Sequence, residues 1–193
     1  TSLSNCFVIG SNDDSDSYGS IMRTDQEQIQ LMKRRGGVGH DISHLRPSGA
    51  MANNSVLKGM AGSTLYMERY SNSTREVSQG DRRGALMLSI DVTHPDAEKF
   101  IDAKLEQDKV TGANISVKLT DEFMNRVKCD GSFYQTFPID LKIPFCGKDY
   151  ELVSKLEYEK LLPVTGGYIK KIEAKKLWNK IIHNAWKSAE PGL

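Results

Sequence analysis

The stretch ALMLSIDVTHPDAEKFIDAKLEQ, residues 85–107, decides the fold class of this chain. Its opening, ALMLSIDV, predicts a strand. Thr93, Pro95 and Asp96 then supply the start signals of a helix. The segment NISVKL (114–119) predicts the next strand. A strand, a helix and another strand in succession favour parallel pairing and therefore an α/β fold.

The same alternation continues on both sides of this stretch. Residues 3–9, LSNCFVI, are apolar enough for a buried strand. Periodic apolar positions predict helices over 17–34, 63–79 and 173–190. One proline and three glycines make 42–62 an extended loop.

The later part of the chain is less regular. A short helix is predicted over 120–129, and 130–172 has β-like segments, with a helix at 153–162 as the alternative. Only three or four strands are well defined, whereas a closed barrel needs about eight. A partial barrel is therefore the expected architecture.

Composition excludes several classes of protein. The chain has 193 residues, 38% of them hydrophobic, and a formal net charge of +1. That balance argues against a nucleic-acid-coating protein, which would be clearly basic. No apolar run approaches the roughly 20 residues of a membrane span, and no signal peptide is visible. Both ends resemble cuts through a longer chain.

Cysteine and histidine usage predicts a reducing compartment and no metal centre. The three cysteines, Cys6, Cys129 and Cys146, are widely spaced and do not form a disulfide framework. A cytoplasmic location is the better interpretation. The four histidines are scattered, and even His40 and His44 lack the context of a zinc site.

Two features near the N-terminus each allow two interpretations. Cys6, in the first predicted strand, is either a buried core thiol or a redox group whose partner lies elsewhere. NDDSDS (12–17) is either a capped helix start or a set of carboxylates that accept from a ribose hydroxyl.

Two further segments combine glycines with cations. KRRGGVGHDISHLRPSGA (33–50) permits close backbone approach to a ligand, and Arg46 before Pro47 is held extended, where it can meet a phosphate. The loop VSQGDRRGA (77–85) carries more charge than a connector needs. Its Gln79 can read a base edge, and its glycines allow it to reorder on binding.

The order of these motifs resembles the large catalytic subunit of ribonucleotide reductase. The similarity is carried by LSNCFVI, the D-S-x-S at 14–17, GGVGHDISHLRPSGA (36–50), YMERYSNSTREVSQGDRRGALMLSIDVTHPDAEKFID (66–102) and the tail KLWNKIIHNAWKSAEPGL (176–193). The sequence is most similar to the adenosylcobalamin-dependent class. Segment 130–172 departs from the pattern and is expected to be a lineage-specific insertion.

The resemblance implies a fold and a set of site residues. The family fold is a ten-stranded α/β barrel, of which this chain would form about half, as a single partial barrel domain over 1–193. Cys6 is implied as one of the two thiols that reduce the substrate, with its partner outside this chain. Asn5, Cys6 and Gly37 are implied to line the ribonucleotide substrate.

The resemblance also implies allosteric control. The effector deoxynucleotide would be held by Asp13, Asp14, Ser15 and Arg46. Gln79 and Arg83, in the S-Q-G-x-x-R-G loop, would then select the substrate base. Asp81 and Arg82 depart from many members, and their part in selection has no explanation.

The family's remaining machinery is missing from this sequence. The N-x-C-x-E loop with the radical cysteine is absent, as is the C-terminal cysteine pair. We therefore expect the chain alone to be inactive and to bind no cofactor. The whole enzyme would use adenosylcobalamin, a thioredoxin-type reductant and a homodimeric assembly, with no membrane or nucleic-acid partner.

Two alternatives remain at this stage. One is a stand-alone nucleotide-binding regulatory module that uses Asp13, Arg46 and Arg83 without catalysis. The other is a nucleic-acid binder, which is weaker because no basic stripe with interleaved aromatics accompanies the arginines.

Overall fold

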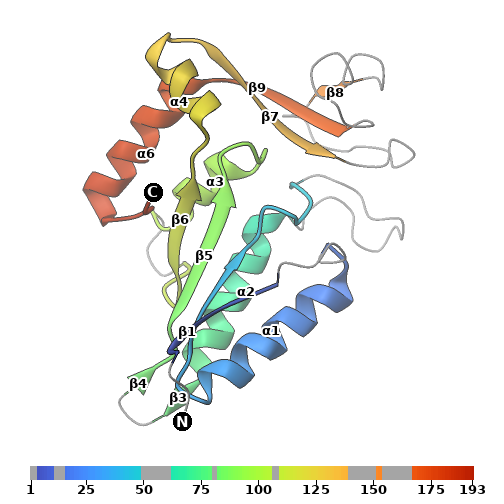
Figure 1. The fold of residues 1–193 in the computed structure, drawn as a ribbon, viewed down its shortest axis with the longest axis vertical. Coiled ribbons are helices and arrows are strands. Elements are labelled where there is room, and N and C mark those ends of the chain that lie inside the picture. The colour runs from blue at the N-terminus through green and yellow to red at the C-terminus, as the bar shows by residue number, and fades with distance from the viewer. Residues whose placement is uncertain are drawn as a thin grey trace.

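The protein is built around a parallel sheet with helices on one face (Figure 1). The computed structural model describes residues 4–10, 16–48, 62–79, 82–105, 109–138, 151–153 and 167–193. Among these residues the sheet has four strands, in the order β1 (Cys6–Ile9), β2 (Gly37–Asp41), β5 (Leu86–Asp91) and β6 (Asn114–Lys118). All neighbouring pairs are parallel. The predicted α/β class is confirmed.

Helices cover one face of this sheet. Those described are α1 (Tyr18–Met32), α2 (Ser63–Glu76), α3 (Ala97–Asp102), α4 (Asp121–Lys128) and α6 (Ala174–Ser188). Helices α1, α2 and α3 contact the strands directly (Figure 1). Because side chains alternate along a strand, one set points into this layer and forms the core. Leu88, Ile90 and Ile115 are at most 1% exposed there.

The other face of the sheet is open. Val8 is 85% exposed and Met87 is 41% exposed, although both lie within strands. Gly39, Met87 and Asn114 occupy adjacent positions across this face. The side chains of this face thus have no second layer packed on them among the described residues, as expected for a sheet that forms part of a barrel wall.

A second, antiparallel sheet lies beyond the carboxyl end of the first. Its strands are ordered β7 (Ser132–Pro138), β9 (Gly167–Glu173) and β8 (Glu151–Val153). Helix α6 follows β9 and returns the chain to the parallel sheet (Figure 1). There Gly192 forms a parallel bridge with Ser116 at the edge of β6. The β-like segments predicted within 130–172 are confirmed at β7 and β8, whereas β9 was not predicted. Residues 139–150 and 154–166 lie outside the described residues.

Two sequence expectations differ from the structure. The glycines of 34–40 were expected only to end the preceding helix, and no strand was predicted there. Residues 37–41 form β2, in the interior of the sheet, because burial of Val38 and His40 outweighs the poor strand propensity of the glycines. On α6, the sequence predicts an apolar stripe through Leu177 and Ile181 that Trp186 would widen. Leu177 and Ile181 are buried as predicted, whereas Trp186 is 83% exposed.

Candidate functional site

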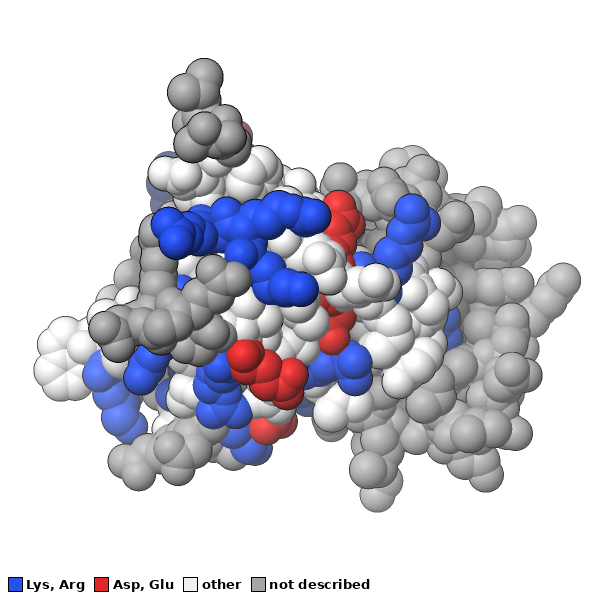
Figure 2. Space-filling model, turned by 90° about the horizontal axis from the view of Figure 1, so that it is seen from below, with Lys and Arg blue, Asp and Glu red and all other residues white. Residues whose placement is uncertain are grey.

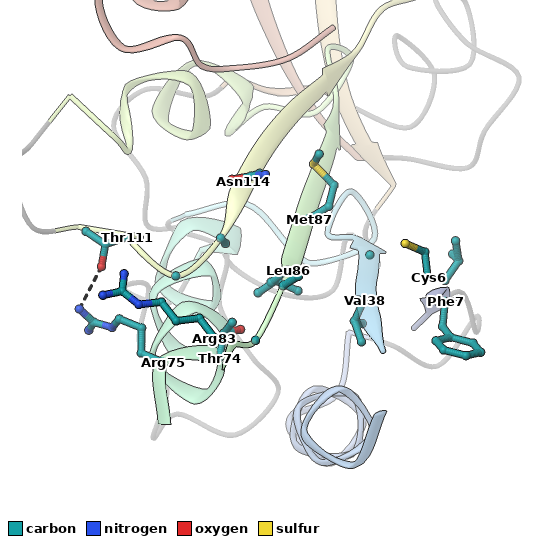
Figure 3. A pocket seen from close by; sticks show the side chains of 17 residues that line it. Cys6, Phe7, Val38, Thr74, Arg75, Arg83, Leu86, Met87, Thr111 and Asn114 are labelled. Atoms are coloured by element: carbon teal, nitrogen blue, oxygen red, sulfur yellow. Dashed lines mark hydrogen bonds between the residues drawn. The ribbon is translucent and has the colours of Figure 1, made fainter. Parts of the chain in front are cut away.

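A cleft of about 910 Å³ opens on the bare face of the sheet, where its strands begin. The start of each parallel strand contributes to it, through Cys6, Gly37, Leu86 and Asn114. Since parallel strands all begin at the same edge, residues far apart in sequence meet here. Figure 3 shows Cys6, Met87 and Asn114 on one side of the sheet, with Phe7, Val38 and Leu86 turned toward the helices.

Cys6 presents an exposed thiol in this cleft. It is a free cysteine and it is exposed. Because it is exposed, the interpretation as a buried core residue is wrong. Its neighbour across the sheet is Gly37, whose backbone N–H donates to the Asn5 carbonyl over 2.6 Å. A Cβ at Gly37 would lie 3.5 Å from Cys6 Sγ. The glycine therefore leaves the thiol uncovered on its β2 side.

Arginines line the rim of the cleft. Arg83, in β4 (Arg82–Arg83), lines it next to Arg75 from the end of α2 (Figure 3). Arg75 Nη1 donates to Thr111 Oγ1 over 3.0 Å, which fixes one guanidinium at the wall. Figure 2 shows Lys and Arg side chains gathered on this end of the molecule. Such a rim favours an anionic ligand such as a phosphate.

A second hollow, of about 320 Å³, adjoins the cleft. Its lining includes Asn5, Cys6, Gly37 and Arg83, with Met32 from the end of α1. Four sequence-predicted residues are thus brought together around one thiol. The backbone of Gln79 pairs with that of Arg82 in a two-stranded ribbon of β3 (Ser78–Gln79) and β4. The side chain of Gln79 and the whole of Asp81 lie outside the described residues.

Arg46 lies at the opposite end of the sheet. It follows the carboxyl end of β2, and its Nη2 is 2.7 Å from Asp16 Oδ2. The Arg46 backbone N–H also donates to Asp16, over 2.9 Å. Asp16 directly precedes α1, whose other end reaches the hollow beside Arg83. The 15 residues of α1 span about 22 Å, so the two arginines of one chain are well separated.

The predicted effector carboxylates are not all visible. Asp13, Asp14 and Ser15 lie outside the described residues. Sequence reasoning missed Asp16 as the partner of Arg46, although its place in the D-S-x-S motif was a signal. It also missed Arg75, Thr111 and Asn114, because only the strand register shows that they reach the cleft.

A buried carboxylate fixes the loop that carries Arg46. Asp96 is 0% exposed, and its Oδ2 accepts from the Ser48 N–H at 2.7 Å, Ser48 Oγ at 3.1 Å and Ser63 Oγ at 3.1 Å. His94 Nε2 donates to the Leu45 carbonyl over 2.8 Å. Burial lowers the pKa of His94 below its ordinary value, so it stays neutral in this position.

An ion cluster lies on the open face at the carboxyl end of the sheet. Lys118 Nζ contacts Asp41 Oδ2 and is 3.2 Å from Asp91 Oδ1. Burial raises the pKa of Asp41, but hydrogen bonds from Lys118 and Ser43 outweigh it and hold the pKa below its ordinary value. Burial likewise lowers the pKa of Lys118, and its carboxylate neighbours more than reverse this. The cluster is charge-satisfied and outside the cleft.

The described residues contain no group of three or more His, Cys, Asp or Glu side chains that could hold a metal ion. None of the helices in the described part of the chain is long and apolar enough to cross a membrane. The cleft itself presents a solvent-accessible thiol beside backbone amides, with guanidinium groups at the rim.

Comparison with known proteins identifies relatives along nearly the whole chain. The model of a family described as "Ribonucleotide reductase, barrel domain" matches residues 4–193. The chain is 33% identical over 195 residues to a vitamin B12-dependent ribonucleoside-diphosphate reductase of Thermoplasma acidophilum, with 99% of this chain and 21% of the relative covered.

More distant relatives give a similar picture. A vitamin B12-dependent ribonucleoside-diphosphate reductase of Mycobacterium tuberculosis is 31% identical, with 99% of this chain and 24% of the relative covered. A ribonucleoside-diphosphate reductase large subunit of variola virus is 29% identical, with 98% and 24% covered. The chain therefore spans a fifth to a quarter of the length of these relatives.

Proposed function

Because this chain belongs to the ribonucleotide reductase barrel-domain family, we propose that it is part of an enzyme that reduces ribonucleotides to deoxyribonucleotides. The observation that carries the proposal is the exposed Cys6 thiol, which lies beside Gly37 in a cleft with an arginine rim. A stand-alone regulatory module would bind nucleotides but would have no use for a thiol in the cleft.

Cys6 is one of two thiols that supply the electrons. Replacement of the ribose 2′-hydroxyl by hydrogen consumes two electrons and two protons and releases water, so a pair of thiols becomes a disulfide. Cys129 is also a free, exposed cysteine, but it follows α4 and does not line the cleft. Cys146 lies outside the described residues. As the family resemblance implies, the second thiol comes from a later part of the enzyme, and a thioredoxin-type reductant restores both. This thiol chemistry suits a cytoplasmic location.

The substrate binds across the two hollows. The backbone around Asn5 and the bare surface of Gly37 admit the nucleotide next to the Cys6 thiol. Arg83 lines both hollows, so a change in the conformation of its loop would change the shape of the substrate site. Gln79 and Arg83 select the base under control of a deoxynucleotide effector, which Asp13, Asp14, Ser15 and Arg46 hold.

A homodimer explains how effector and loop communicate. Arg46 and Arg83 lie near opposite ends of α1, a helix about 22 Å long. If α1 and α2 pack against the same helices of a second copy around a two-fold axis, Arg46 of one chain approaches the loop of the other. Exposed Tyr18 and Leu65, 56% and 51% accessible, supply apolar surface on these helices.

Adenosylcobalamin fits the whole enzyme rather than this chain alone. Beside Cys6, Gly37 and Gly39 present bare backbone to the cleft, with no side chain over β2. When bound, the cofactor supplies the radical that starts the reaction. The residues of this chain bind the substrate, orient it and deliver reducing equivalents. Without the rest of the enzyme the chain is inactive.

The test is Cys6→Ser in the full-length protein, with Cys129→Ser as the matched control. We expect Cys6→Ser to lower turnover with a thiol reductant by about 10³-fold or more, with substrate affinity retained, because an alcohol does not form the disulfide. Cys129→Ser should keep wild-type turnover. Near-normal turnover of Cys6→Ser would refute the assignment, as would deoxynucleotide formation by the 193-residue chain alone.

Arg83→Ala tests the loop separately. It should weaken the effect of each effector on substrate choice and leave the melting temperature nearly unchanged, because Arg83 is exposed. Unchanged base preference across effectors would contradict the role given to the loop.

A further inference from the structure

The wall of the cleft opposite Cys6 is formed by the residues that lead into β6. Thr111, Gly112, Ala113 and Asn114 all line it. Asn114 carries a carboxamide, which donates hydrogen bonds through its nitrogen and accepts them through its oxygen. The function proposed above gives this wall no part in binding the substrate.

The wall is held against α2. The Gly112 N–H donates to Ser71 Oγ over 2.8 Å, and a Cβ at Gly112 would lie only 2.4 Å from the Ser71 carbonyl oxygen. Arg75 Nη1 donates to Thr111 Oγ1 over 3.0 Å. Just before the wall, Val110 is buried and has a φ of 50°. A β-branched residue keeps this left-handed conformation only where its surroundings enforce it, and such strain is concentrated at functional sites.

The Asn114 carboxamide is not used to hold the fold together. The side chain is exposed and lies on the same side of the sheet as Cys6 (Figure 3). Of the residues that the structure describes, none hydrogen-bonds to it. Asparagine is also poorly suited to strands, so the formation of β6 does not explain its presence at this position.

Exposed apolar residues beside Asn114 indicate that the whole enzyme covers this face. Val8, Gly39, Met87 and Asn114 form one row across the sheet, since each is the register partner of the next. Val8 is 85% exposed and Met87 is 41% exposed, as expected for a surface that another part of the enzyme covers. An amide on a covered face needs a hydrogen-bond partner, because burying it without one is unfavourable.

The floor between Cys6 and this wall is bare, so a ligand can extend across it. Gly37 lies beside Cys6, and a Cβ at Gly37 would be 3.7 Å from that of Ala85 on the next strand. Strands β1 and β6 are three strand spacings apart, roughly 14 Å. A nucleotide whose ribose lies at Cys6 can therefore present its base to Asn114.

We propose that the Asn114 carboxamide hydrogen-bonds the exocyclic group of the substrate base, which makes Asn114 a further specificity-determining residue. This inference rests on the proposed function, since it takes the ribose to lie at the Cys6 thiol. Asn114 Nδ2 donates to a carbonyl, as in uracil, and Oδ1 accepts from an amino group, as in cytosine. The amide thus admits both bases, whereas a carboxylate in its place could only accept.

Steady-state reduction of cytidine diphosphate (CDP) and uridine diphosphate (UDP) by the full-length protein, at one fixed effector concentration, tests the proposal. Asn114→Asp should raise the ratio of kcat/KM for CDP to kcat/KM for UDP about tenfold, because a carboxylate accepts from the cytosine amino group and repels the uracil carbonyl. Asn114→Ala should lower kcat/KM about tenfold for both nucleotides, since each loses one hydrogen bond. Asn125→Asp and Asn125→Ala, at an exposed position of α4 outside the cleft, are the matched controls and should behave as wild type.

An unchanged ratio in Asn114→Asp would overturn the proposal, because a residue that only shapes the wall, or that contacts the ribose or phosphates, does not distinguish an amino group from a carbonyl. Wild-type kcat/KM of Asn114→Ala for both nucleotides would overturn it as well. The exposed side chain lets both variants fold, which thermal unfolding checks. If the wild-type protein reduces neither CDP nor UDP, the proposed function fails and this inference fails with it. Reduction of both with an unchanged ratio in Asn114→Asp removes this inference alone.

Discussion

Replacing Asp96 by alanine should destabilise the protein more than any change at a surface carboxylate. The Asp96 side chain is 0% exposed, and its Oδ2 accepts hydrogen bonds from Ser48 N, Ser48 Oγ and Ser63 Oγ. Each buried donor left without an acceptor costs about 1–3 kcal/mol, and water reaches the half-buried Ser48 in part. We therefore expect Asp96→Ala to lower the free energy of unfolding by about 3–5 kcal/mol.

Two further variants isolate the cause. Asp96→Asn keeps one carbonyl oxygen in the position of Oδ2 and should cost only about 1 kcal/mol. Gly62→Ala leaves Asp96 intact but would place a Cβ 2.0 Å from Ser48 Oγ and 2.6 Å from Asp96 Oδ2. That overlap displaces the loop and should cost about 2–4 kcal/mol. Asp96→Ala and Gly62→Ala break the same contacts. The variant that combines them should therefore lose at least about 1 kcal/mol less stability than the sum of the two single losses.

Urea unfolding followed by circular dichroism measures the free energy of unfolding of the four variants against that of the wild type. A loss below about 1 kcal/mol for Asp96→Ala would refute the reasoning, since it would mean that the three donors find water instead. Equal losses for Asp96→Asn and Asp96→Ala would also refute it, because charge and not acceptor geometry would then be decisive. Strict additivity with Gly62→Ala would separate the two sites.

Other predictions concern the core, the thiol and pH. Burial lowers the pKa of His40 to about 4, so the unfolded chain takes up a proton first and stability should fall by about 3 kcal/mol between pH 6.5 and 4 on account of this group. Urea titrations at several pH values measure this. His40→Leu should have a shallower slope than wild type by this amount, with the shares of His44 and His94 remaining; a wild-type slope in that variant would contradict it. Gly37→Val should slow alkylation of Cys6 at least about threefold but leave Cys129 unchanged, as peptide mass spectrometry would show, because its methyl groups approach Sγ; equal rates would contradict the contact. Phe123→Ala empties a fully buried position and should cost about 3–5 kcal/mol, and a loss under about 1 kcal/mol in urea unfolding would contradict its place in the core.

The alternation of strand and helix could be predicted because it depends on local signals. ALMLSIDV and NISVKL form β5 and β6, and the acids after Thr120 begin α4, whose N-cap is Thr120. Strand β2 could not be predicted, since GVGHD has weak strand propensity. Its interior place in the sheet supplies the burial that local sequence does not encode.

The candidate site was only partly predictable. Cys6, Gly37 and Arg83 belong to sequence motifs, and the structure brings them to one edge of the sheet. Arg75, Thr111 and Asn114 carry no motif, because their place in the cleft depends on strand register and on the packing of α2. The separation of Arg46 from Arg83 along α1 could not be predicted either, because the sequence shows only that both belong to motifs of one allosteric system.

The sequence by itself determined the α/β class and the order of motifs, because helix caps, strand composition and turn residues act over a few neighbouring residues. Tertiary structure alone decided that the Cys6 thiol is exposed, that Arg46 and Arg83 lie near opposite ends of α1, and that Gln135 Oε1 is buried without a partner among the described residues. Each of these depends on which distant segments pack together. Burial, distance and hydrogen bonding are properties of that packing and are not encoded in any single stretch of the chain.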